Sequence, residues 1–341
     1  MPDVVFISEK APNQQHAGGK GVKDIESVLQ DNYSQLTILY TMPGRREIFT
    51  YIKTFWHNFW SLRHTVQTCK NKTIIIQYPH YNYGLSLKKQ LHRILKTNKV
   101  ILLVHDVDSI RFNTGIEEEV NLLNQASVVV LHNQYMTDYL KAHGLTTKVV
   151  NVDIFDYLVP KIPEQNNYRL GKQIVFAGNL GKSKFIKQLA DESLGVSLNL
   201  YGPNLDLKIK NKVHWLGSYL PEEIPFKIKG SFGLVWDGDS IDGCKGLIGD
   251  YLKVNYPHKL SLYLAAGIPV ITWKQAAIAK IVEKYNIGFI VDSLKEVSDY
   301  IDSLSQEDYM KYLNNVAELQ KKVISGNFTK EAFNRAVELI N

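Results

Sequence analysis

The sequence has little cysteine, no long apolar run and no export signal among its 341 residues. Its two cysteines, Cys69 and Cys244, lie far apart without metal-ligand spacing, so we expect reduced thiols and assign them no function. Apolar stretches such as residues 100–104 are far shorter than the roughly 18 residues of a membrane span. The first residues lack the basic and apolar regions of a secretory signal. These absences predict a soluble, cytoplasmic protein.

The chain also has only a modest excess of positive charge. The net charge of +6 is distributed along the chain and suits an anionic ligand. No strand alternates aromatic and basic residues, so we expect no nucleic-acid partner. Residues 49–63 combine Phe and Trp side chains with Lys53 and Arg63. We interpret them as an aromatic face buried in the first domain or in the interface of a homo-oligomer, a dimer or tetramer. Peripheral contact with an anionic membrane is the alternative.

Short β-branched runs alternate with longer segments of helical periodicity, which indicates an α/β fold with parallel sheets between helices. Residues 153–171 interrupt this pattern with two prolines and a polar run, which indicates a linker. Two successive doubly wound units place a ligand at the carboxyl ends of their strands, in a cleft between domains. The predicted strands are 4–8, 36–40, 73–77, 99–105, 127–131 and 148–150, then 173–177, 197–201, 213–216, 232–236, 270–272 and 289–291.

Two glycine-rich loops each follow a strand and open a helix. The first contains Gly18 and Gly19, and the second contains Gly178, Asn179 and Lys182. Glycine lets backbone N–H groups approach an anion, and the helix N-terminus adds the positive end of its dipole. The first loop lacks Walker spacing, so a plain tight turn is its alternative interpretation. The second loop favours a phosphate site because Lys182 adds a cation.

The segment that follows residue 251 carries the most informative motif. Pro257 starts a helix whose first residues, His258 and Lys259, bring free N–H groups and a cation to where a diphosphate would bind. Tyr219 follows the third strand of the second half, where its ring would either stack on a planar base or join the core.

This helix start resembles the nucleotide-binding stretch of GT-B glycosyltransferases, in which a proline and a basic residue open the helix below the diphosphate. The F-A-G-N-L, L-Y-G-P and W-L-G segments of the second half are similar and stand in the same order. Residues 17–21, 77–79 and 104–106 also resemble the bacterial glucosyltransferases that add glucose, as the second sugar, to N-acetylglucosamine on serine-rich adhesins, and related galactofuranosyltransferases.

The resemblance implies a GT-B fold of two Rossmann-like doubly wound domains that face a cleft. Residues 1–158 would bind the acceptor, residues 159–326 the nucleotide sugar, and a helix at 327–341 would cross back to the first domain. It also implies a metal-independent, oligomeric enzyme that needs no cofactor beyond its UDP-sugar substrate. The implied nucleotide-binding residues are Gly18, Gly19, Gly178, Asn179, Lys182, Tyr219, Asn255, Pro257, His258 and Lys259.

The chain departs from related retaining enzymes at this helix. Lys253, Leu260 and Ser261 occupy the positions where those enzymes commonly carry carboxylates, so a ribose-binding glutamate is not expected there.

Polar residues after the strand at 99–105 are the candidates for acceptor chemistry. Asp106, or His105, would take the proton from an acceptor hydroxyl at the carboxyl end of this strand. A polar turn with a surface salt bridge is the alternative. Asp237, Asp239 and Asp242 lack metal-ligand spacing, and we interpret their loop as a contact to the sugar or acceptor.

The sequence therefore predicts a hexosyltransferase, with glucose favoured, that uses a UDP-sugar and a sugar acceptor such as N-acetylglucosamine on a glycoprotein or a glycan precursor. The alternatives are a non-catalytic partner subunit of the same fold, which would bind the acceptor, and a UDP-sugar epimerase, which would need no acceptor.

Overall fold

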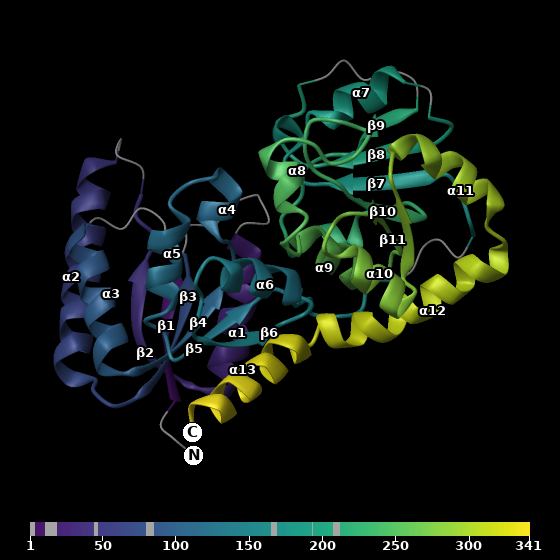
Figure 1. Cartoon of the computed structure of the whole chain (residues 1–341). Helices are drawn as coiled ribbons and strands as arrows, with labels where there is room; N and C mark the ends of the chain where they lie inside the picture. Colours follow the sequence, from purple (N-terminus) through teal and green to yellow (C-terminus); the bar gives the residue numbers. More distant parts are fainter. Residues whose placement is uncertain are drawn as a thin grey trace. The chain divides into compact units, whose positions relative to one another are not determined.

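The computed structural model describes residues 4–10, 19–43, 47–79, 85–164, 169–192, 194–206 and 212–341. Its packing divides the chain into two compact units, which Figure 1 shows with their helices and strands. The first unit contains residues 4–10, 21–152 and 329–341, and the second contains Gly19, Lys20 and residues 153–328. Among the described residues, no helix is both long enough and apolar enough to cross a bilayer.

The first unit is built on a parallel six-stranded sheet with the strand order β2-β1-β3-β4-β5-β6. Its inner strands are continuous runs of buried Val, Ile and Leu, as expected of a parallel sheet covered on both faces. The strands are β1 (Val4–Lys10), β2 (Ser34–Tyr40), β3 (Thr73–Tyr78), β4 (Lys99–Val104), β5 (Val128–Leu131) and β6 (Lys148–Asn151). The helices are α1 (Lys20–Asn32), α2 (Ile48–Thr68), α3 (Leu85–Thr97), α4 (Asp108–Phe112), α5 (Ile116–Leu123) and α6 (Gln134–Ala142).

The second unit repeats this plan with a parallel sheet of order β12-β11-β10-β7-β8-β9. Its strands are β7 (Gln173–Ala177), β8 (Ser197–Tyr201), β9 (Val213–Trp215), β10 (Phe232–Val235), β11 (Val270–Trp273) and β12 (Gly288–Val291). Its helices are α7 (Phe185–Asp191), α8 (Leu247–Tyr251), α9 (His258–Ala265), α10 (Ala279–Tyr285), α11 (Val297–Ser303) and α12 (Gln306–Val323), with short 3-10 turns η2 (Leu180–Lys182), η3 (Ile224–Phe226) and η4 (Leu294–Glu296). All the strands predicted from the sequence are present, which confirms the α/β prediction.

The segment expected to be a linker begins as part of the second unit. Ile154 and Tyr157 are buried in its core, and the Tyr157 hydroxyl donates to the Pro221 carbonyl oxygen at 2.6 Å. The division between units therefore lies between residues 152 and 153, earlier than the expected 158/159.

The last helix, α13 (Asn327–Ile340), ends in the first unit, to which residues 329–341 belong. Arg335 donates to the Asn151 carbonyl oxygen at 2.7 Å, and the Lys148 ammonium donates to the Leu339 carbonyl oxygen at 2.7 Å. The Phe333 ring meets the edge of Tyr33.

Helix α9 lies unusually close to the second sheet. A side chain at Gly233 in β10 would meet the Tyr263 ring 2.3 Å away, so only glycine fits there. The buried Tyr263 hydroxyl accepts a hydrogen bond from Ala177 N at 2.9 Å and lies 3.2 Å from the Leu234 carbonyl oxygen. One hydroxyl thus links α9 to both β7 and β10.

We expect Tyr263→Phe to cost about 1 to 3 kcal/mol of unfolding free energy, because the buried Ala177 N–H loses its acceptor. Hydrogen exchange at the Ala177 amide should accelerate correspondingly. Tyr285→Phe, at a half-buried position of the same unit, is the control and should change stability by less than about 0.5 kcal/mol. Unchanged protection of Ala177 in the Tyr263 variant would contradict the assigned bond.

Candidate functional site

Three glycines meet at the carboxyl ends of β7, β8 and β9. Gly178 N donates to the Tyr201 carbonyl oxygen at 3.0 Å, and Gly202 N donates to the Gly217 carbonyl oxygen at 2.9 Å. Gly202 has φ +136°, and a Cβ there would lie 1.8 Å from the Gly178 carbonyl oxygen. Glycine is therefore required at 202, and the three loops form one edge lined by backbone.

Asn179 and Lys182 lie in the turn that follows β7. The Asn179 side-chain oxygen caps η2 by accepting from Gly181 N at 3.2 Å, and it also accepts from the Asn204 side chain at 3.3 Å. Lys182 ends η2 with an exposed side chain. Asn179 thus holds the shape of the loop, while Lys182 presents its charge to solvent.

The start of α9 lies against this loop. Pro257 is the N-cap residue, so the first N–H groups of the helix, at His258 and Lys259, have no partner within the helix. The Lys259 ammonium lies 2.6 Å from an Asp237 carboxylate oxygen and over the Phe176 ring. A Cβ at Gly178 would lie 3.2 Å from Lys259 Cε. The structure therefore brings two of the predicted residues, Gly178 and Lys259, into contact.

A residue that the sequence analysis did not select packs on a ring beside the same helix start. Lys20, which follows Gly19, is buried, donates to the Leu158 carbonyl oxygen at 2.7 Å and lies over the Tyr157 ring. The centroid of that ring is 5.3 Å from the His258 ring centroid. A lysine inside the glycine motif was the available signal for Lys20, whereas nothing local marked Tyr157. Gly18 lies outside the described residues.

Asn255 and Tyr219 complete the predicted set. Asn255 Oδ1 is buried and has no hydrogen-bond partner within the part of the chain that the structure describes. The half-buried Tyr219 packs over Gly217, donates to the Leu216 carbonyl oxygen at 3.1 Å and lies 6.3 Å from the Tyr201 ring. Tyr219 therefore packs over the glycine edge while its side chain stays partly exposed.

The aspartates of the loop after β10 form ion pairs with lysines. Asp237 pairs with Lys259, Asp239 with Lys184 at 3.3 Å, and Asp242 with Lys295 at 3.1 Å. Hydrogen bonds from Ser293 and then Lys295 lower the pKa of Asp242. In the described ranges, no group of three or more His, Cys, Asp or Glu side chains is arranged to hold a metal ion.

In the first unit, His105 and Asp106 follow β4 as predicted. His105 Nε2 lies 2.7 Å from Gln77 Oε1, and the Asp106 carboxylate accepts from Arg111 at 2.8 Å. The salt bridge expected under the alternative interpretation is thus present, and it holds the Asp106 carboxylate in one orientation. The buried His132 also contacts this turn, with its Nε2 2.9 Å from the His105 carbonyl oxygen.

A pocket of about 800 Å³ opens beside this turn. Its walls include Tyr78, Ser109 and Glu119. Glu119 accepts hydrogen bonds from the Tyr78 hydroxyl at 2.8 Å and from Ser109 N at 2.7 Å, so the polar part of the wall is rigid.

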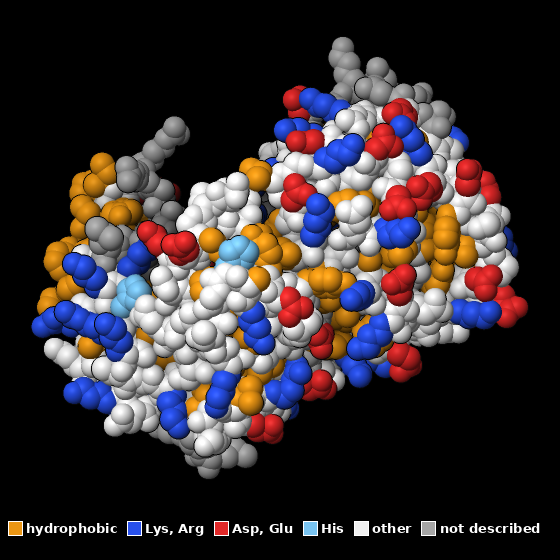
Figure 2. All heavy atoms as spheres, viewed as in Figure 1, with side chains coloured by type: hydrophobic (Ala, Val, Ile, Leu, Met, Phe, Trp, Pro, Cys, Tyr) orange, Lys and Arg blue, Asp and Glu red, His pale blue; other side chains and the backbone are white. Residues whose placement is uncertain are grey.

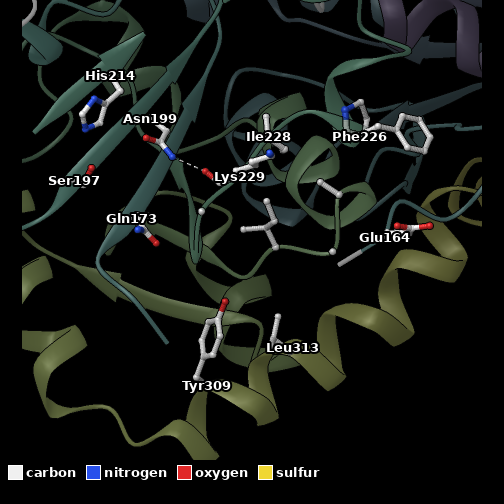
Figure 3. Close-up of a pocket in the computed structure, with 15 residues that line it drawn as sticks. Glu164, Gln173, Ser197, Asn199, His214, Phe226, Ile228, Lys229, Tyr309 and Leu313 are labelled. Carbon is white, nitrogen blue, oxygen red and sulfur yellow. Dashed lines mark hydrogen bonds between the residues drawn. The ribbon is translucent and has the colours of Figure 1, made fainter. Parts of the chain in front are cut away.

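A second pocket, of about 430 Å³, lies at the opposite edge of the second sheet (Figure 3). Gln173 and Ser197, the first residues of β7 and β8, line it together with Asn199, whose side chain donates to the Lys229 carbonyl oxygen at 2.6 Å. Because the glycine loops follow the other ends of these strands, this pocket contains none of the predicted site residues.

Comparison with known proteins agrees with this geometry. Models of the N-terminal and C-terminal domains of glucosyltransferase 3-like proteins match residues 4–154 and 174–336. The chain belongs to the glucosyltransferase 3-like family.

This family member is 33% identical to the beta-1,6-galactofuranosyltransferase WbbI of Escherichia coli K12, over 79% of this chain and 80% of that protein. It is 28% identical to glucosyltransferase 3 of Streptococcus gordonii, over 70% and 71% of the two chains. It is thus a glycosyltransferase.

Solved structures confirm the predicted GT-B fold. An α-glucosyltransferase in complex with UDP and DNA superposes with a TM-score of 0.59 at 14% identity, over 99% of this chain and 98% of the other. The T4 phage BGT in complex with UDP-glucose superposes with a TM-score of 0.54 at 12% identity, over 99% of both chains.

Acid should lower the stability of the protein through His132, which contacts the turn at His105. Burial lowers the pKa of His132 from 6.5 to about 4. Between these two pH values the unfolded chain binds a proton at this position more readily than the folded chain, so stability falls as the pH falls. His132→Gln removes this titration and keeps a donor for the His105 carbonyl oxygen.

Urea unfolding should therefore show that the wild type loses roughly 3 kcal/mol more than His132→Gln between about pH 7 and pH 4. Parallel losses in both proteins would show that His132 is not buried in its neutral form.

Proposed function

We propose that this glycosyltransferase moves a hexose from a UDP-sugar to a sugar acceptor such as N-acetylglucosamine on a glycoprotein or a glycan precursor. The observation that carries the proposal is the contact between the start of α9 and the glycine loop after β7, where Lys259 meets Gly178. The N–H groups that open the helix, the positive end of its dipole and an ammonium group converge there, and each favours a diphosphate.

The diphosphate would lie on the N–H groups of His258 and Lys259, with Lys182 as a second cation. Asp237 fixes the Lys259 ammonium in place before the ligand arrives, which lowers the ordering cost of binding. The buried Asn255 oxygen would accept a hydrogen bond from the nucleotide, and the Tyr219 ring would cover its base. As the sugar departs, negative charge grows on the diphosphate, and these groups stabilise it without a metal ion.

On the acceptor side, Asp106 would take the proton from the attacking hydroxyl, and His105 would orient the acceptor. The Arg111 pair holds the Asp106 carboxylate in one orientation, as a positioned general base requires. The pocket beside Tyr78 and Ser109 would hold the acceptor sugar.

Glucose is the favoured donor sugar, and galactofuranose is the second candidate. The first follows from the glucosyltransferase 3-like models that match both halves of the chain. The second follows from the 33% identity to a galactofuranosyltransferase.

Release of UDP from a panel that includes UDP-glucose and UDP-galactofuranose, with EDTA present, tests this proposal. We expect release from one donor only when an N-acetylglucosamine-bearing acceptor is added. Binding of UDP-sugars without release would favour a non-catalytic partner subunit, and conversion of the free UDP-sugar without an acceptor would favour an epimerase.

The role of Lys259 is tested by Lys259→Ala, which removes a cation from the departing diphosphate. We expect turnover to fall by about 100-fold. Lys253→Ala is the matched control, since Lys253 belongs to the same segment but pairs with Asp250 at the surface, and it should retain wild-type turnover. Wild-type turnover in Lys259→Ala would overturn the assignment.

A further inference from the structure

Helix α2 presents a stripe of large apolar side chains to solvent. Phe49 is 91% exposed, Trp60 58% and Trp56 51%, and Ile48 and Ile52 are exposed beside them. Residues 48, 52, 56 and 60 are spaced by four, so they follow one face of the helix. The stripe is therefore not buried within the first unit, because α2 packs on the unit with its other face.

The opposite face of α2 is bound to the first unit. Asn58 is buried, and its side chain accepts from Tyr40 N at 2.9 Å and donates to the Tyr40 carbonyl oxygen at 2.7 Å. It thereby satisfies the backbone at the end of β2, the edge strand of the first sheet. Leu62 and Thr65 continue the same buried face. Helix α2 therefore cannot turn its aromatic stripe inward without exposing these contacts.

The stripe is also ordered internally. The rings of Phe55 and Phe59 stack with centroids 6.1 Å apart, and Phe59 meets Trp56 and Trp60 edge-on at 5.8 Å and 5.6 Å. Because the half-buried phenylalanines hold the two tryptophans, little side-chain entropy remains to be lost when the indole rings bind a surface.

The segment that contains this stripe carries charge of one sign. Residues 48–105 contain nine Lys and Arg and no Asp or Glu, while the rest of the chain carries more acidic than basic residues. The net surplus of six is therefore concentrated here and is not spread along the chain as expected. Four of these cations, Lys88, Lys89, Arg93 and Lys96, are exposed on α3, which packs beside α2.

Figure 2 shows how these features adjoin, with apolar side chains along the α2 edge of the first unit and Lys and Arg side chains over neighbouring α3. Indole rings prefer the boundary between water and hydrocarbon, and each Lys or Arg near an anionic bilayer contributes about 1 kcal/mol. A second copy of the same surface would instead bring like charges together, which opposes association.

We propose that the α2–α3 surface docks this glycosyltransferase onto an anionic lipid bilayer, with Phe49, Trp56 and Trp60 entering the headgroup region and the α3 cations contacting lipid phosphates. This binding does not depend on the nucleotide site, so its test is separate from that of the proposed function.

Co-sedimentation with vesicles tests the proposal. The wild type should pellet with vesicles of equal parts phosphatidylglycerol and phosphatidylcholine, should not pellet with pure phosphatidylcholine, and should be released by high salt. Trp56→Ser combined with Trp60→Ser should weaken binding by about tenfold or more, as should Lys88→Glu combined with Lys89→Glu.

Matched controls lie in the second unit. Lys321→Glu with Lys322→Glu changes another pair of adjacent exposed lysines on a helix, and Ile162→Ser with Leu220→Ser removes two exposed apolar side chains. Both should pellet like the wild type. Far-UV circular dichroism and thermal unfolding serve as the folding check for every variant.

Three results would overturn the proposal. The first is equal binding of the wild type to both kinds of vesicle, and the second is wild-type binding by the folded Lys88/Lys89 variant. The third is a wild type that is dimeric in solution without lipid affinity and becomes monomeric in the Trp56/Trp60 variant, which would make the stripe a subunit interface.

Discussion

The close packing of α9 on the second sheet determines where the candidate site lies. Gly233 leaves room for the Tyr263 ring, and the Tyr263 hydroxyl bonds across β7 and β10. The start of α9 is thereby held against the glycine loop at the end of β7, where Gly178 has no side chain that would displace Lys259. A small change in the height of α9 over the sheet would separate the helix N-terminus from that loop.

Electrostatics at this position suits an anion that gains charge during a reaction. The helix dipole and the first N–H groups of α9 are fixed by the backbone, and Asp237 fixes the Lys259 side chain. Lys20 places a further cation over the Tyr157 ring, which lies beside the His258 ring. The same groups that bind a diphosphate tightly would stabilise it still more as a leaving group, which joins binding to catalysis in one arrangement.

The sequence predicted most of the fold because each strand is a short β-branched run between turn residues, as in residues 99–105 and 128–131. It also predicted the start of α9, since Pro257 before a basic pair is a local signal. The pairing of Lys259 with Asp237 and the contact of Lys20 with Tyr157 were not predictable, because each joins residues far apart in the chain. The exposure of the α2 stripe was missed for a related reason. A helix rich in Phe and Trp has two apolar faces, and the fit of Asn58 to Tyr40, with Leu62 and Thr65 beside it, determines which one is buried.

The central claim is that the second phosphate of the nucleotide lies at Lys259 and the start of α9. Calorimetric titration with UDP and with UMP, in the wild type and in Lys259→Ala, tests it most directly. The account predicts that the wild type prefers UDP by about tenfold or more and that the variant loses this preference while binding UMP as the wild type does. An undiminished preference for UDP in Lys259→Ala would contradict it and would place the second phosphate elsewhere.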